Sequence, residues 1–246
     1  MTRPLELQRT RDVSTLFGDT LRVLLARPGT FLLLSAAVVV PAELVVSGIG
    51  LEALTAPYDR SPSPVALLVP SLVSFLVVAP LVTATTIHAL LPAAEGRRPA
   101  AGPALTAGFE AFPALFVAVA LAALDVTLGL LAFVVPGVYL LVRWVFVPQA
   151  VVLDGARGTA ALARSGEVVR GFWWRAFGIL LLGNLAATLP GLVIAGPLRA
   201  LAESTDRELY SLIGSAASQV VTAPFVAVLL TLLYFDLRAR RGAEAG

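Results

Sequence analysis

Cysteine and lysine are absent from the 246-residue chain, and it has a single histidine, His88. Without cysteine there is no disulfide, no thiolate nucleophile and no cysteine-ligated metal site. One histidine also leaves little material for metal binding or acid–base chemistry. We therefore expect no catalytic residues, no bound metal and no cofactor.

Charge is scarce as well: charged residues make up 14% of the chain, against about 25% in typical soluble domains. Hydrophobic residues make up 58%, and the mean hydropathy is +0.87. A soluble fold of this size lacks the polar surface to cover so many apolar side chains. The composition therefore predicts an all-α integral membrane protein.

Long apolar runs divide the chain, and a membrane span needs about 20 such residues. We expect six transmembrane helices arranged as three hairpins, with a turn between the third and fourth spans at Pro136 and Gly137. Pro70 and Pro80 interrupt the second span. The predicted spans are 30–49, 65–91, 112–135, 138–153, 177–195 and 212–234.

Two further stretches have helical periodicity with arginines opposite apolar side chains. The first runs from Ser14, the expected N-cap, to Arg27, and the second from Thr159 to Arg175. Both are typical of amphipathic helices that lie on a membrane surface. We expect a polar arm over residues 1–12, one membrane domain over 13–238 and a basic tail over 239–246.

The arginines predict the orientation, because positively charged residues accumulate on the cytoplasmic side of a membrane. If both ends of the chain are cytoplasmic, 14 of the 18 arginines lie on that side. Three lie in outer loops, and Arg143 lies within a span. The 14 are Arg3, Arg9, Arg11, Arg22, Arg27, Arg97, Arg98, Arg157, Arg164, Arg170, Arg175, Arg238, Arg240 and Arg241.

Three motifs resemble a known family. Residues 136–155 read PGVYLLVRWVFVPQAVVLDG, residues 161–178 read ALARSGEVVRGFWWRAFG, and residues 234–241 read YFDLRARR. They resemble the membrane domain found beside glycerophosphodiester phosphodiesterases and its free-standing, uncharacterised bacterial relatives. The resemblance implies a multi-helix bundle in a bacterial cytoplasmic membrane. It does not imply phosphodiesterase activity, because that activity belongs to a separate soluble barrel of about 250 residues, for which this chain has no room.

Asp125 and Arg143 are charged residues within predicted spans, where each charge costs at least about 2.5–3.5 kcal/mol. A turn near residue 134 places both nine residues from it, at similar depth on adjacent helices. We expect an ion pair that locks these helices together. The alternative is that Arg143 faces a cavity and binds an anionic headgroup, with Asp125 orienting it.

Two other polar residues are candidates for an intramembrane site. Glu43 follows Pro41 in the first span, where it reaches the outer headgroups or lines a cavity at the kink. His88 lies near the inner end of the second span. There we favour a hydrogen bond to a neighbouring helix over a proton relay.

The amphipathic stretches also predict a partner, the anionic lipids of the inner leaflet. The candidate headgroup contacts are Arg22, Arg27, Arg164, Arg170, Arg175, Trp173 and Trp174. Nucleic acid is disfavoured, since the basic residues are spread over separate segments. A membrane-protein partner or a second copy of the chain stays open.

These features favour a non-enzymatic membrane protein, a scaffold or an accessory in membrane and lipid homeostasis. The alternative is a transporter or lipid-handling protein that uses Asp125 and Arg143. A cavity lined by those residues would favour the alternative, whereas a dry and fully paired interior would favour the scaffold.

Overall fold

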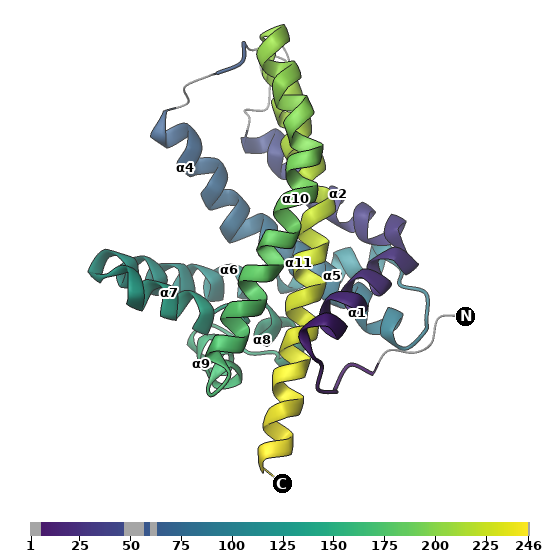
Figure 1. The fold of residues 1–246 in the computed structure, drawn as a ribbon, viewed down its shortest axis with the longest axis vertical. Helices are drawn as coiled ribbons and strands as arrows, with labels where there is room; N and C mark the ends of the chain where they lie inside the picture. The colour runs from purple at the N-terminus through teal and green to yellow at the C-terminus, as the bar shows by residue number, and fades with distance from the viewer. Residues whose placement is uncertain (1–5, 47–56, 60–62, 246) are drawn as a thin grey trace.

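The computed structural model describes residues 6–46, 57–59 and 63–245, and in these ranges it is all-α (Figure 1). Six helical stretches are long and apolar enough to cross a membrane, as predicted. The elements in chain order are α1 (Val13–Ala26), α2 (Pro28–Val46), α4 (Pro64–Val73), the π-helix η1 (Ser74–Val78), α5 (Ala79–Ala94), α6 (Ala101–Ala132), α7 (Val134–Arg143), α8 (Val147–Asp154), α9 (Thr159–Val169), α10 (Trp173–Thr205) and α11 (Glu208–Ala245).

The first two spans follow the prediction with local differences. α2 begins at Pro28, and the predicted end of this span, 47–49, lies outside the described residues. The second span is α4, η1 and α5 in succession. Its π-helix precedes Pro80, which has no N–H to donate, and the N–H of Ala79 instead reaches the carbonyl of Ser74. The proline thus widens one turn without ending the helix.

The third span begins 11 residues before the prediction, at Ala101. Residues 101–111, which lie between two predicted spans, are therefore helical. Pro103 occupies the first turn of α6, where a missing N–H costs no hydrogen bond. A Cβ on Gly108 would lie 2.5 Å from a Thr85 methyl group, so α5 and α6 approach closely at this point.

The predicted turn at Pro136 and Gly137 is wrong by a few residues. The break between α6 and α7 is at Phe133, whose backbone is extended (φ −164°, ψ 154°). Pro136 and Gly137 lie in the first turn of α7, where proline is tolerated. A second break, at Trp144–Phe146, separates α7 from α8 within the fourth span.

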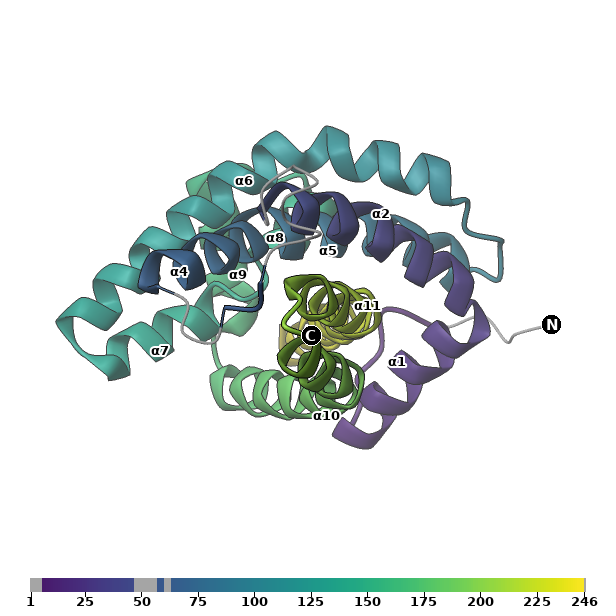
Figure 2. The same cartoon turned by 90° about the horizontal axis from the view of Figure 1, so that it is seen from above.

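α11 is the central helix, and the other elements surround it (Figure 2). It buries 61% of its apolar stretch, whereas α10 buries 11%. The main core includes Leu16 of α1, Phe31 of α2, Phe146, and Leu232 and Tyr234 of α11. The α10–α11 hairpin follows the long axis of the molecule, and the α6–α7 hairpin runs across it (Figures 1 and 2).

The outer surface is strongly apolar. At the tip of the α6–α7 hairpin, Leu131, Phe133 and Val135 are each more than three-quarters exposed, and Leu189 and Val193 of α10 are also exposed. Such apolar surface is far larger than monomeric soluble proteins leave in water. Together with the six apolar helices, it makes the chain a multi-pass membrane protein.

Both predicted amphipathic helices need correction. Asp12, not Ser14, caps α1, because its carboxylate accepts the N–H of Thr15. The hydroxyl of Ser14 donates to the same carboxylate. The second amphipathic helix ends at Val169 rather than at Arg175, because Gly171 adopts a left-handed backbone (φ +84°) that stops it.

Candidate functional site

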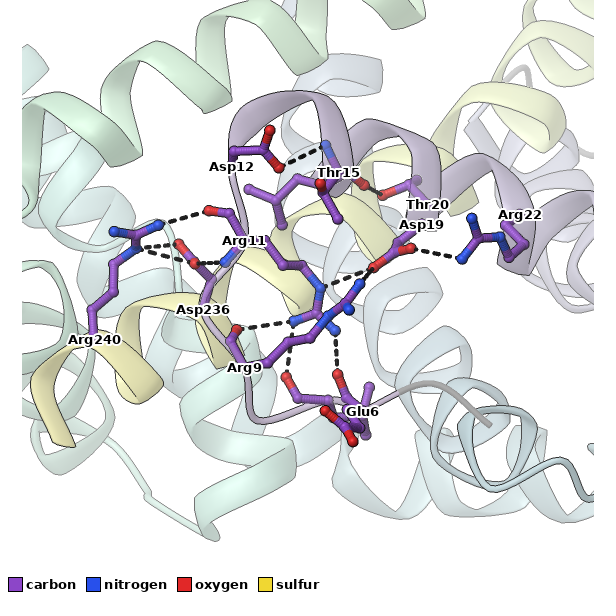
Figure 3. A network of polar contacts seen from close by, with 12 residues as sticks. Glu6, Arg9, Arg11, Asp12, Thr15, Asp19, Thr20, Arg22, Asp236 and Arg240 are labelled. Carbon is purple, nitrogen blue, oxygen red and sulfur yellow. Dashed lines mark hydrogen bonds and ion pairs between the residues drawn. The ribbon is translucent and has the colours of Figure 1, made fainter. Parts of the chain in front are cut away.

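Asp236 of α11 is fully buried, yet it is surrounded by arginines. Its carboxylate accepts the backbone N–H of Arg11 at 2.6 Å, Nε of Arg175 at 2.9 Å and Nε of Arg240 at 3.1 Å. Arg175 and Arg240 also donate to the carbonyl of Arg11. Asp236 therefore fastens the N-terminal arm to α10 and α11. Figure 3 shows its bonds to Arg11 and Arg240.

Asp19 of α1 is the second buried carboxylate of this cluster. Its oxygens accept hydrogen bonds from Arg9 at 2.7 Å, Arg11 at 3.1 Å and Arg22 at 3.1 Å (Figure 3). The Arg11 guanidinium also donates to the carbonyls of Glu6, Leu7 and Arg9. Burial lowers the pKa of Arg11, and the hydrogen bond to Asp19 opposes that shift.

Asp154, the last residue of α8, joins this helix to two others. Its carboxylate accepts from Nε of Arg164 at 2.6 Å, from the Tyr234 hydroxyl at 2.6 Å and from Arg238 at 2.8 Å. The hydrogen bond from Arg164 to Asp154 raises the pKa of Arg164. Arg164 also pairs with Glu167 at 3.2 Å. α8, α9 and α11 are therefore tied together at one carboxylate.

Sequence reasoning did not single out Asp19, Asp154 or Asp236. The signal was present for two of them, since Asp154 and Asp236 stand within the quoted motifs that end in LDG and begin with YFDLR. An aspartate that follows an apolar run and has arginines nearby in the sequence is a candidate for a carboxylate that binds several arginines. Asp19 has no comparable motif around it.

The predicted Asp125–Arg143 ion pair is wrong. Within the described ranges no ion pair joins these residues, and Arg143 lies against α9 instead. A Cβ on Gly166 would be 2.9 Å from Nε of Arg143. The break at Phe133 lies within one residue of the turn assumed for this pairing, so similar depth alone did not bring the two side chains together. The side chain of Arg143 instead lies against Gly166 of α9.

Arg143 lines a small cavity of about 140 Å³ where α7, α9 and the start of α10 meet. Its other walls include Tyr139, Val169, Arg170 and Trp173. The indole N–H of Trp173 donates to the Tyr139 carbonyl at 3.2 Å, and the two rings are stacked. In the alternative hypothesis, Arg143 faces a cavity and Asp125 orients it. The structure has such a cavity beside Arg143, but Asp125 does not line it.

The described part of the chain contains no group of three His, Asp or Glu side chains placed to hold a metal ion. The carboxylates of Asp19, Asp154 and Asp236 are instead held by arginines. That arrangement makes a structural electrostatic centre, in which each carboxylate already has its donors.

Residues 99–237, from just before α6 to the end of the core-forming part of α11, match a family described as a domain of unknown function (DUF7847). The chain belongs to the DUF7847 family. No curated protein and no solved structure matches it. The match gives no link to the glycerophosphodiester phosphodiesterase-associated family that the motifs resemble.

The DUF7847 region contains two of the three aspartate centres, Asp154 and Asp236, and also the cavity beside Arg143. The N-terminal arm and α1 lie outside it. Arg11 nevertheless completes the hydrogen bonding of Asp236. The N-terminal segment is therefore part of the same folded unit as the family region.

Glu43 and His88 lie on helices before the DUF7847 region and do not meet each other or Arg143 in one site. Gln219 of α11 donates to Glu43, and the Ser74 hydroxyl of the π-helix donates to Gln219 at 3.4 Å. His88 is half-buried on α5, and its charged neighbour is Glu110 of α6. Glu43 therefore takes part in a polar link between α2, α11 and η1.

The predicted headgroup contacts fall into two groups. Arg164 and Arg175 are held by Asp154 and Asp236, and Arg22 pairs with Asp19 although it remains largely exposed. The remainder, which are outside the aspartate centres, are Arg27, Arg170, Trp173 and Trp174. Trp174 is 78% exposed at the start of α10.

A larger groove of about 440 Å³ lies between α1, α2, α10 and α11. Its lining is apolar except for Thr222, and it includes Phe17, Leu25, Ala187 and Phe225. The volume is within the range of about 300–1,000 Å³ that suits small ligands. An apolar lining of this kind suits a hydrocarbon chain.

Proposed function

We propose that this DUF7847 protein is a non-enzymatic scaffold or accessory in membrane and lipid homeostasis. Its setting in the proposal is a bacterial cytoplasmic membrane, with both chain ends cytoplasmic and anionic inner-leaflet lipids as partners. The resemblance to the phosphodiesterase-associated membrane domain supports the setting. The observation that carries the proposal is that Asp19, Asp154 and Asp236 each accept several hydrogen bonds from arginines, which leaves them engaged in structure.

A second candidate, a lipid-handling protein, is favoured by the apolar groove. An acyl chain of a membrane lipid fits a groove lined by Phe17, Leu25 and Ala187. This candidate no longer rests on an Asp125–Arg143 pair. It differs from the scaffold in requiring that lipid enter and leave the groove during function.

One experiment separates these functions. The purified chain is reconstituted in vesicles with Mg²⁺ or Mn²⁺, labelled phospholipid and a glycerophosphodiester. We expect neither hydrolysis nor lipid translocation, while deletion of the gene changes the lipid composition of the membrane. Hydrolysis that Asp154→Asn abolishes would show an enzyme instead. Translocation blocked by groove-filling Ala187→Trp, and not by Ala132→Trp on the exposed end of α6, would establish the second candidate.

Reporter fusions test the orientation. We expect reporters at Ala100 and Gly158 to have cytoplasmic activity, because each follows an even number of crossings and adjoins arginines. A reporter at Glu203, near the α10–α11 turn, is expected to have the opposite activity. If the reporters at Ala100 and Gly158 lay on opposite sides of the membrane, the proposed topology would be wrong.

A further inference from the structure

Arg143, which lines the cavity, carries a buried hydrogen-bond donor without a partner among the described residues. Nε of Arg143 and Nε1 of Trp144 are both buried without a partner among the described residues. The Arg143 guanidinium lies over the Trp144 ring, 4.9 Å from its centroid. Buried polar groups are almost always hydrogen-bonded, so the unpaired Nε of Arg143 indicates a missing acceptor beside it.

The charges around the cavity have one sign. Arg170 lines it with an exposed side chain, and Arg241 donates to the Arg170 carbonyl at 3.1 Å while its own Nε is buried and unpaired. The nearby acid on α9, Glu167, is engaged by Arg164. No carboxylate is among the described residues that line the cavity. An anion there gains attraction and meets no like charge.

The cavity walls are held in place before any ligand arrives. The Ser165 hydroxyl donates to the Arg143 carbonyl at 2.7 Å and accepts the N–H of Phe146 at 3.2 Å, which fixes the break between α7 and α8 to α9. Gly166 leaves the space that the Arg143 guanidinium occupies. Such preorganisation lowers the entropic cost of binding.

We propose that this cavity binds one phosphate group through Arg143, with Arg170 at its edge. Arginine presents a planar set of N–H donors that suits phosphate oxygens. A volume of about 140 Å³ is below that of sites for whole ligands, so the cavity admits one group while the rest of the molecule stays outside. The phosphate belongs either to a lipid headgroup or to a free phosphate ion.

The position of Arg143 at the end of α7 has a simpler explanation, the favourable interaction of a cation with a helix C-terminus. That interaction accounts for the charge. It supplies no acceptor for Nε of Arg143 or for Nε1 of Trp144. The proposal rests on the unpaired Nε of Arg143 and on the cavity that Arg143 lines, and it holds for a scaffold and for a lipid-handling protein alike.

Binding is measured on the full-length chain in nanodiscs. In one arm, native mass spectrometry counts bound lipids in phosphatidylcholine discs with and without phosphatidylglycerol. In the other, inorganic phosphate is titrated and tryptophan fluorescence is followed, since Trp173 lines the cavity and Trp144 contacts the Arg143 guanidinium. We expect Arg143→Gln to weaken binding about tenfold or more, the effect of losing a charged hydrogen bond.

The controls make each outcome decisive. Arg98→Gln removes the same charge from an exposed position outside the cavity and should bind like the wild type. Gly166→Ala displaces the Arg143 side chain while keeping its charge, so it should also weaken binding, and it decides the matter if Arg143→Gln does not fold. If the cavity variants bind less lipid but the same amount of inorganic phosphate, the ligand is a lipid headgroup. If they bind inorganic phosphate more weakly, the ligand is the free ion. Wild-type binding in both cavity variants, or no binding of either probe to the wild type, overturns the proposal.

Discussion

Asp236→Asn is expected to destabilise the protein by about 3–5 kcal/mol, the usual cost of removing one partner from a buried ion pair. Asp236 is fully buried and accepts from Arg11, Arg175 and Arg240. An asparagine loses the negative charge and turns an amide donor toward these donors. Thermal unfolding in detergent, followed by tryptophan fluorescence, measures the loss.

The same substitution should release the N-terminal arm, because Asp236 binds the backbone of Arg11. Limited trypsin digestion should then cleave at Arg9 or Arg11 much faster in Asp236→Asn than in the wild type. The control is Glu95→Gln, which breaks an exposed pair with Arg97 and should cost no more than about 1 kcal/mol. Equal stability of the two variants would show that the Asp236 cluster does not hold the fold.

Hydropathy was sufficient to predict the six spans, because apolar length is the property that a bilayer selects. It did not predict where helices start or bend. α6 begins at Ala101, and its first turn contains a proline, where the missing N–H costs no hydrogen bond. In the sequence, such a proline cannot be distinguished from a proline in a loop. The π-helix before Pro80 likewise depends on which carbonyl the displaced N–H reaches.

The candidate site was harder to predict because it depends on side-chain direction. Arg143 was singled out as a charge within a span, and its partner was assigned from depth alone. Depth does not say which face of α7 a residue occupies, and Gly166 on α9 offers the space that the guanidinium takes. Asp236 escaped notice for the opposite reason, since next to a basic tail it resembles an exposed charge.

The three aspartate centres also account for many of the chain's arginines. Positive charge near a membrane surface needs only lipid as a partner, and positive-inside topology requires no acidic residue. Here Asp19, Asp154 and Asp236 turn part of that charge inward and connect segments from both ends of the chain. The arginines outside these centres, notably Arg143 and Arg170, are then the ones available for an external anion.

Gly137→Ala is expected to cost about 1–3 kcal/mol, although alanine normally stabilises a helix relative to glycine. A Cβ on Gly137 would lie 2.4 Å from the Leu130 side chain and 2.8 Å from the Leu130 backbone nitrogen. The side chain can rotate, but the backbone nitrogen moves only if α6 and α7 separate. Small residues are what permit such close helix approach in membranes.

Gly178→Ala is the matched control, since it makes the same change in α10, where nothing lies within 4 Å of the added Cβ. We expect this control to gain up to about 1 kcal/mol from the higher helix propensity of alanine. The two variants should therefore shift the thermal unfolding midpoint in opposite directions in the same detergent. If Gly137→Ala is as stable as Gly178→Ala, the close contact between α6 and α7 is not present in the protein. The α6–α7 hairpin, and with it the placement of Arg143 against α9, would then need a different packing.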